Sequence, residues 1–402
     1  MLTLYRSNRA EVLVQLLAAQ LRHPPPGPWE PVQVVVNTWP TSRWLGEALA
    51  LHLGGIAAHL RFPFPGSHLR RVVKLLLADG EGTEQEAEAD PWRAIHLVWS
   101  VLEELPWIAS EPEGDLLRLW LLRQPSQGRV DLPNWQLARA IADAFDDYAL
   151  YRPELLSQWD AGRDLGMTGQ RLPSQQLWQP KLYRRLRERL PVQPFGLRVK
   201  EVIHRLGTGE PLAAALKAHL GERLRVFGPS SMAPIQVQLL QAIATALPVD
   251  LYLLTPCPGL WQRCVERRQA LKEALALQQP LAEEWMGKAP PLEARFGRLG
   301  AEFQQLLEGT GEAQLSEERE ESLFLRPTRL PSQGQTAAPS LLHQLQEHLL
   351  SEDLQPRLQL APGDPSLEFH ACPGPLRQVQ IVRDRVLQLL AADPTLEPRH
   401  IL

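Results

Sequence analysis

Three aspartates lie close together in the stretch IADAFDDYALYRPELLSQW, residues 141–159. If residues 133–151 form one helix, a rotation of about 100° per residue puts Asp143, Asp146 and Asp147 within an arc of about 100°. Such an arc is a solvated acidic face, part of a metal site, or a surface whose carboxylates accept hydrogen bonds from cytosine amino groups or pair with basic residues. A metal site needs further oxygen or histidine ligands, and no partner motif supplies them.

Aromatic and basic residues gather in a second stretch, RFPFPGSHLRRVVK, residues 61–74. Phe62 and Phe64 lie in a proline-stiffened loop, and cations follow at the start of a predicted helix, beginning with Arg70. A groove for single-stranded DNA combines aromatic rings that stack on bases with cations that neutralise phosphates. The alternative is a buried phenylalanine pair beside a solvated helix end.

A nucleotide would bind at the first strand–loop–helix, where glycine amides and one lysine of a P-loop surround phosphates. Here the loop consists of Arg6, Ser7, Asn8 and Arg9, without glycine or a Lys-Ser/Thr pair. The later strand at 224–227 is followed by GPSS instead of an acidic pair that would hold magnesium. The sequence therefore predicts that this chain does not hydrolyse ATP by itself.

Strands and helices alternate in the first 60 residues, and this order predicts an α/β layer. The apolar run VQVVVNT is typical of a parallel strand that is covered on both faces. The helix that follows has Thr41 or Ser42 available as its N-cap. From about 90 to 220 the pattern is almost entirely helical, which indicates an insertion, and strand–helix–strand alternation returns at 224–258, with a helix opened by Pro234.

Two polar stretches, 78–91 and roughly 307–339, are predicted to be an exposed loop and a linker. Beyond them, the segment that begins SLEFHA predicts a strand, a loop, a long helix and the first residues of another strand. Because the last predicted strand is incomplete, we expect the chain to be a fragment of a longer protein.

Composition limits the class of protein. The chain has 402 residues, a formal net charge of −4, 44% hydrophobic and 22% charged residues, so a globular protein is expected and any nucleic-acid binding must use local basic patches. Its three cysteines form no disulfide framework or Cys-x-x-Cys pair, which favours a reducing, cytoplasmic compartment. No window approaches the ~18 consecutive apolar residues of a membrane span.

Several segments, in order, resemble one known family: LYRSNRAEVL, WLGEAL, GIAAHLRFPFPGS, FDDYALYRPELLSQW, VFGPSSMAPIQVQLLQAI, LLTPCP, ARFGRLGAEF and DPTLEPRHIL. They are similar to the RecC family, the gamma subunits of exodeoxyribonuclease V, and the chain matches the N-terminal part. The resemblance implies a superfamily 1 helicase-like α/β domain without ATPase motifs, with a large helical insertion and the start of a second α/β domain. The implied divisions are a first part of the helicase-like domain at 1–85, the insertion at 86–220, the continued domain at 221–306, a linker at 307–362 and the second domain at 363–402.

The resemblance also implies a function. A RecC subunit is a non-catalytic part of an ATP-dependent helicase-nuclease that repairs double-strand breaks by homologous recombination, and it channels the unwound 3′ strand and scans it for a Chi sequence. The implied partners are single-stranded and forked DNA and RecB-like and RecD-like helicase subunits, which would carry ATP and Mg, while this chain needs no cofactor. Carried over by position, the DNA-binding residues are Asn37, Trp39, Arg43, Phe64, Arg70, Asp143, Asp146, Asp147 and Arg152.

Some of these residues differ in type from those of the well-known Chi reader, namely Trp39, Arg43, Phe64, Arg70 and Asp147. Strand binding is therefore the firmer expectation, and the particular octamer is left open. Three alternatives to this function are a dead-helicase subunit of the AddB type, a purely structural helical scaffold and an active helicase. The loop from Arg6 to Arg9 argues against the active helicase.

Overall fold

The structure of the chain is a computed structural model, which describes residues 1–22, 31–77, 90–123, 131–208, 212–259, 273, 297–309, 323–327, 339–351 and 357–401. Most of the predicted loop at 78–91 and of the predicted linker at 307–339 lies outside these ranges. None of the helices in the described ranges is long and apolar enough to cross a membrane.

A five-stranded sheet forms the base of the structure, with the strand order β1-β5-β4-β2-β3. Every neighbouring pair is parallel, which confirms the predicted α/β layer. The β-branched run of β2 is buried on both faces, as parallel strands usually are. The strands are β1 (Leu2–Ser7), β2 (Val32–Val36), β3 (Leu60–Arg61), β4 (Leu224–Phe227) and β5 (Val249–Leu254).

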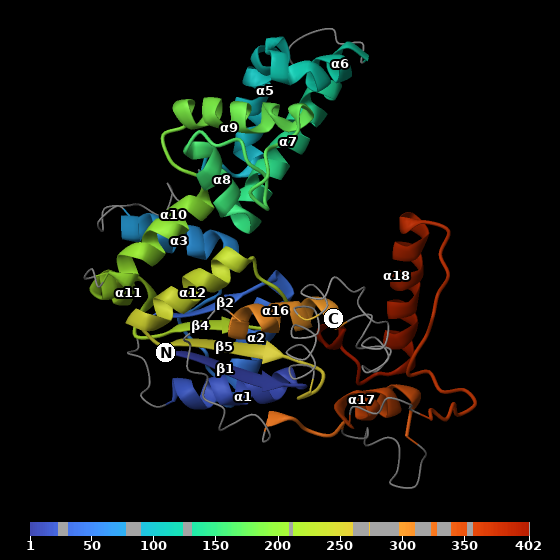
Figure 1. Cartoon of the computed structure of the whole chain (residues 1–402). Coiled ribbons are helices and arrows are strands. Elements are labelled where there is room, and N and C mark those ends of the chain that lie inside the picture. Colours follow the sequence, from blue (N-terminus) through green and yellow to red (C-terminus); the bar gives the residue numbers. More distant parts are fainter. Residues whose placement is uncertain are drawn as a thin grey trace.

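Helices cover both faces of this sheet (Figure 1). On one face α1 and α2 pack in a core with alternate strand residues such as Val34 and Tyr252. On the other face α3, α10, α11 and α12 pack against the intervening residues, such as Val35 and Leu251. The helices are α1 (Ala10–Leu21), α2 (Trp39–His52), α3 (Pro65–Leu77), α10 (Phe195–Gly207), α11 (Leu212–Leu220) and α12 (Pro234–Ala246).

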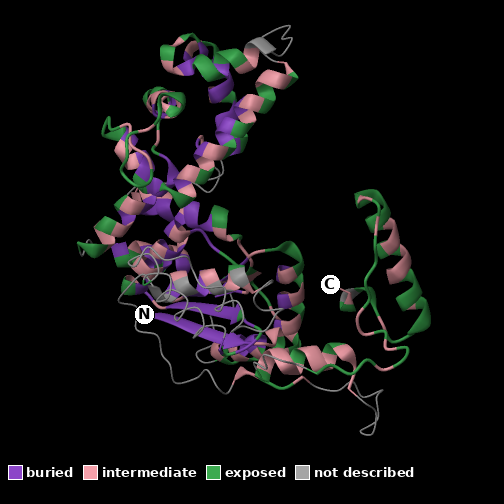
Figure 2. Cartoon of the chain, turned by 45° about the vertical axis from the view of Figure 1, so that its right-hand side comes forward, coloured by how far each residue is buried: buried purple, intermediate pink, exposed green. Residues whose placement is uncertain are grey.

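A helical part rises from the α3 side of the sheet and has a core of its own (Figures 1 and 2). Large aromatic side chains fill this core, among them Trp92, Phe145, Trp159 and Tyr183, and each is nearly inaccessible to solvent. Helix α7 confirms the predicted helix at 133–151. The helices are α5 (Ala94–Ser110), α6 (Asp115–Arg123), α7 (Leu132–Tyr151), α8 (Pro153–Asp160) and α9 (Trp178–Arg189).

The described C-terminal residues, from 297 onward, contain helices but no strand. They include α16 (Arg298–Gly309), α17 (Leu341–Ser351) and α18 (Pro375–Ala392), and α18 stands apart from the sheet in Figure 1. The predicted strands on either side of α18 were wrong for the described residues 357–401. A strand needs a neighbour for its ladder of hydrogen bonds, and no described strand lies beside this segment.

Candidate nucleic-acid interface

Strands β2 and β3 end side by side, so the loops that follow them emerge together. The two strands pair in parallel, and beyond the pairing the backbone N–H of Val36 donates to the carbonyl oxygen of Pro63 over 3.0 Å. The carboxyl ends of parallel strands form the edge where α/β proteins usually bind ligands. Asn37, Trp39 and Phe64 therefore lie along one carboxyl edge of the sheet, although Phe64 is distant from the other two in sequence.

The two aromatic side chains at this edge are exposed. The exposed fraction is 66% for Trp39 and 41% for Phe64. Phe62 is different, because it packs against the core between the sheet and α2. The two alternatives for this loop thus each describe one of its phenylalanines: Phe62 belongs to the core, and Phe64 faces solvent.

Arg43 adds a cation to the same edge. It follows Trp39 by four residues on α2, so the two side chains lie on one face of the helix. Arg43 is exposed, and no acidic side chain of the described residues forms an ion pair with it. We use the name carboxyl edge for Asn37, Trp39, Arg43 and Phe64.

The start of α2 explains why Trp39 is presented this way. The helix begins at Trp39, earlier than the predicted caps, and Thr38 is the N-cap, with its hydroxyl accepting from the backbone N–H of Thr41 over 3.3 Å. The prediction that Thr41 or Ser42 caps the helix was wrong, because Thr38 is extended and precedes a proline at the second helical position. Trp39 consequently stands in the first turn, outside the core.

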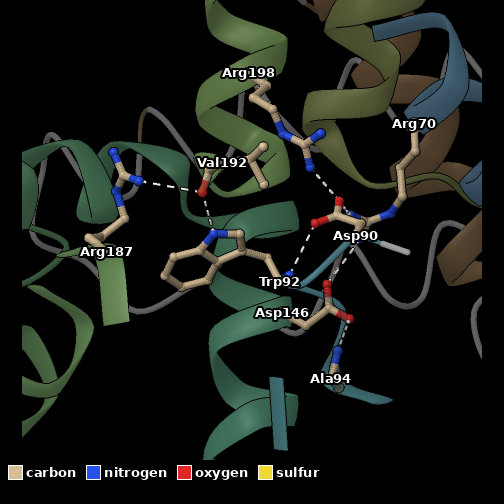
Figure 3. Close-up of polar contacts among 8 residues, drawn as sticks. All are labelled: Arg70, Asp90, Trp92, Ala94, Asp146, Arg187, Val192 and Arg198. Atoms are coloured by element: carbon tan, nitrogen blue, oxygen red, sulfur yellow. Dashed lines mark hydrogen bonds and ion pairs between the residues drawn. The ribbon is translucent and has the colours of Figure 1, made fainter. Parts of the chain in front are cut away.

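Arg70, predicted for the DNA-binding set, lies in the interior, and Asp146, predicted for the same set, is partly buried beside it. The Arg70 guanidinium contacts the carboxylate of Asp90 at 2.7 Å and that of Asp146 at 3.1 Å (Figure 3). It also lies 4.5 Å from the centre of the Phe195 ring. Only 8% of Arg70 is exposed, so its donors are used by the protein itself. This placement favours a structural role for both residues.

The same network includes a second arginine and two backbone amides. Arg198 forms an ion pair with Asp90, whose other oxygen accepts from the backbone N–H of Trp92 over 3.0 Å. Asp146 accepts from the N–H of Ala94, the first residue of α5, over 3.0 Å, which satisfies a helix-terminal donor. We call Arg70, Asp90, Asp146 and Arg198 the joint (Figure 3).

The other predicted residues on α7 and its end are exposed. Asp143 pairs with Arg139 at 3.0 Å along the helix, and Asp147 faces solvent. Arg152 caps the end of α7 and lies 5.5 Å from the centre of the Tyr148 ring. Within the described ranges, no group of three or more His, Cys, Asp or Glu side chains is arranged to hold a metal ion.

His68 lies on α3 between Phe64 and Arg70, and only 4% of it is exposed. Its backbone N–H donates to the carbonyl oxygen of Phe64 over 2.9 Å, which ties the Phe64 loop to the helix. Burial, assisted by the nearby positive charge of Arg71, lowers the pKa of His68 from 6.5 to about 4. The imidazole is therefore neutral at physiological pH.

The loop after β1 is bound by a later segment of the same chain. The side-chain amide of Asn8 donates to the carbonyl oxygen of Leu325 over 2.7 Å and accepts from the N–H of Leu325 over 3.0 Å. The hydroxyl of Ser7 donates to the carbonyl oxygen of Leu323 over 2.5 Å. A cavity of about 650 Å³ lies beside this contact, lined by residues that include Arg9 and Thr255.

Sequence reasoning missed half of the joint. Asp90 and Arg198 belong to no motif: Asp90 precedes a proline, and Arg198 lies between two aliphatic residues. Only the packing of α3, α7 and α10 against the start of α5 brings them together. The arc of three aspartates did indicate a polar site on this helix. It could not distinguish Asp146, which faces the joint, from its exposed neighbours Asp143 and Asp147.

The fold and the two sites define a class: a mixed α/β protein, mostly helical, with a small parallel sheet whose carboxyl edge carries exposed aromatic rings and a helical part fastened to the sheet by buried ion pairs. Residues 2–352 match the model of a known family, the N-terminal domain of RecC. The chain belongs to the RecC family.

Relatives from several bacteria bear the name RecBCD enzyme subunit RecC. The protein from Mycolicibacterium smegmatis is 31% identical over 406 residues, an alignment that covers 100% of this chain and 33% of the relative. The protein from Escherichia coli is 27% identical over 433 residues, covering 100% of this chain and 36% of the relative. The Haemophilus influenzae protein is 25% identical over 448 residues, covering 100% and 38%. The chain thus spans about a third of the length of the curated relatives it matches.

Proposed function

We propose that this chain binds single-stranded DNA at its carboxyl edge, as a non-catalytic part of an ATP-dependent helicase-nuclease. The observation that carries the proposal is the exposure of Trp39, in the first turn of α2, and of Phe64, in the loop before α3, beside the cation of Arg43, which has no ion-pair partner among the described residues. Exposed rings can stack on bases whatever their sequence, and a cation beside them neutralises phosphates. A purely structural scaffold has no need for this combination.

The loop after β1 supports the non-catalytic part of the proposal. It offers no glycine backbone and no lysine to a phosphate, and the side-chain amide of Asn8 is already paired in both directions with the backbone of Leu325. The α/β domain is thus proposed to be a helicase-like domain that no longer uses ATP. ATP and Mg would act in RecB-like and RecD-like partner subunits, and the relatives' name, RecBCD enzyme subunit, is consistent with such an assembly.

The biological setting is part of the same proposal. A subunit of this kind would work in the cytoplasm on forked DNA at double-strand breaks, where it receives the unwound 3′ strand for homologous recombination and scans it for a Chi-like sequence. The exposed carboxylates of Asp143 and Asp147 support the scanning role, because they can accept hydrogen bonds from cytosine amino groups. An AddB-type subunit is the alternative, and membership of the RecC family favours a RecC-type subunit over it.

The test replaces the stacking rings. Trp39→Ala and Phe64→Ala should each weaken binding of the full chain to a fluorescent oligothymidylate by about 1–3 kcal/mol if a base stacks on the ring. Both side chains are exposed, so the melting temperature should stay close to that of the unaltered protein. Trp135→Ala is the matched control, since this tryptophan is also exposed, at 36%, but lies at the start of α7. Unchanged affinity in both edge variants would remove the proposal.

The ATP part is tested separately. The full chain should not retain labelled ATP in equilibrium dialysis, with or without Mg. Saturable retention by the full chain, competed by unlabelled ATP, would show that the loop after β1 still accepts a nucleotide and would contradict the non-catalytic assignment.

A further inference from the structure

We infer that Arg70, Asp90, Asp146 and Arg198 are positioning residues: the joint fixes the helical part on the sheet, and thereby sets the path of a DNA strand between the carboxyl edge and the exposed end of α7. The inference about the path rests on the proposed function. The inference about the fixed orientation rests on the structure alone.

Each ion pair of the joint crosses from one core to the other. Arg70 comes from α3 and Arg198 from α10, and both helices pack mainly in the core of the sheet, while Leu197 of α10 also reaches the core of the helical part. Asp146 comes from α7, and Asp90 lies two residues before Trp92; α7 and Trp92 both contribute to the core of the helical part. The sheet side therefore supplies both cations, and the helical side supplies both carboxylates. An orientation that separated the two sides would separate every pair together.

Burial makes the joint sensitive to geometry. Asp90 is 5% exposed and Arg70 8%, so neither charge can exchange its partner for water without a rearrangement. Burying ion pairs costs desolvation, and their better supported use is to select one arrangement among several. Asp146 adds to this selection, because one carboxylate holds the Arg70 guanidinium and the first N–H of α5 at the same time.

The joint is also connected to both parts of the proposed DNA surface. Helix α3 begins at Pro65, the residue after Phe64, and the Phe64 carbonyl accepts from the N–H of His68 within that helix. On the other side, Asp146 lies on α7 between the exposed Asp143 and Asp147. Rotation at the joint would thus change the position of α7 relative to the edge, without altering either surface.

The first experiment measures orientation. Spin labels are attached to a ketone-bearing amino acid placed at Leu51 on α2 and Leu132 on α7, both exposed, so that the native cysteines stay unmodified. Arg70→Met should broaden the distance distribution, because the side chain keeps its bulk and loses both ion pairs. Arg139→Met is the matched control: it removes the exposed pair with Asp143 on α7 and should leave the distribution unchanged.

Conservative variants keep the inference testable if Arg70→Met does not fold. Arg70→Lys retains the charge but cannot contact both carboxylates with a planar fork, so the distribution should broaden less than with Met. Asp146→Asn retains an acceptor for the N–H of Ala94 and should also broaden it less. A distribution like that of the unaltered protein in both Arg70 variants would overturn the inference.

The second experiment distinguishes positioning from DNA contact. Two oligothymidylates are compared, one long enough only for the carboxyl edge and one long enough to reach α7. Arg70→Lys and Arg70→Met should weaken binding of the longer strand alone, with an unchanged salt dependence for the shorter strand. If Arg70 contacts a phosphate, the salt slope of the shorter strand should fall by about 0.7 on replacement by Met, and the inference is then wrong.

The two proposals can fail separately. Unchanged DNA affinity in the Trp39 and Phe64 variants, together with a broadened distance distribution in Arg70→Met, would contradict the proposed function and support the orienting role of the joint. Loss of affinity in the edge variants, together with an unchanged distance distribution in the Arg70 variants, would support the proposed function and contradict the orienting role of the joint.

Discussion

The carboxyl edge and the joint contain residues that are close in sequence but differ in their exposure to solvent. The stretch 61–74 supplies Phe64 to the edge, where it is exposed, and Arg70 to the joint, where it is buried. On α7, Asp146 belongs to the joint while Asp147 faces solvent. In both stretches, residue type and spacing did not indicate which side chain would be buried and which would be exposed. The comparison teaches that the partners supplied from distant segments decide whether a charged or aromatic side chain is available to a ligand.

The two regions also differ in what their contacts do. At the edge, Trp39 and Arg43 have few partners within the described chain, so their interaction energy is available to a ligand. In the joint the charges satisfy one another, because a buried charge without a partner is costly. Substitutions at the edge should therefore change binding, whereas substitutions in the joint should first change stability and orientation.

The largest effect is expected for Asp90→Ala. This change leaves the guanidinium groups of Arg70 and Arg198 without their shared carboxylate, and removing one partner of a buried pair typically costs about 3–5 kcal/mol. Chemical denaturation should show the loss in the free energy of unfolding. Asp143→Ala on α7 is the matched control, because its exposed pair with Arg139 should be worth less than about 1 kcal/mol. Equal losses for the two variants would break the distinction between joint and surface.

His68, which lies on α3 between the two regions, should make stability depend on pH. Its pKa in the folded state, about 4, is below the ordinary value of 6.5, so the unfolded chain binds the proton more readily. Its contribution is therefore fully retained above pH 6.5 and is lost as the pH falls from 6.5 towards 4. Between pH 7 and pH 5 the loss should be about 2 kcal/mol.

The measurement compares the free energy of unfolding at pH 7 and pH 5 for the unaltered protein and for His68→Leu, which fills the same apolar site without a titrating group. The variant should lose less stability over this range, by about 2 kcal/mol. His96→Leu is the control, since it removes an exposed histidine of α5 and leaves His68 in place. An identical pH dependence in all three proteins would show that His68 is accessible to water in the folded state.

Much of the fold was predictable, because it depends on local patterns. The apolar run of β2, the helix of α7 and the start of α12 at Pro234 all follow from periodicity and proline position. The strand predicted at SLEFHA failed for a physical reason, since an extended segment becomes a strand only when another strand lies beside it. The short strand β3 was not predicted, because its pairing with β2 depends on the tertiary fold.

The candidate site was predictable to a smaller extent. The sequence pointed to Phe64 and to the aspartates of α7, but it could not show that β2 and β3 end together and bring Trp39 beside the Phe64 loop. It also could not show that Asp90 would form an ion pair with the guanidinium of Arg70. Both facts depend on contacts between residues that are far apart in the chain.

A smaller effect is expected at Arg43, where the edge can be tested for phosphate contact without altering its rings. Arg43→Gln should lower the salt slope of single-strand binding by about 0.7, and weaken binding about fivefold near 0.1 M salt, since one counterion fewer is released. Arg43→Lys keeps the charge and should leave the slope unchanged. Because the side chain is exposed and unpaired within the described residues, stability should not change. A slope that is unchanged in Arg43→Gln would place the phosphates elsewhere.

The smallest effects on stability are expected for the exposed aspartates of α7, where the comparison with the joint is sharpest. Asp143→Asn and Asp147→Asn should each alter the free energy of unfolding by no more than about 0.5 kcal/mol, whereas Asp146→Asn should cost more because it weakens the contact with Arg70. If the exposed pair reads bases, an amide that also donates should change which sequences are preferred more than the overall affinity. The measurement is selection of bound strands from a randomised single-stranded library, with Asp115→Asn on α6 as an exposed control. An unchanged sequence profile for both variants would leave these carboxylates as a solvated face, and the strand would then be bound at the edge without being read on α7.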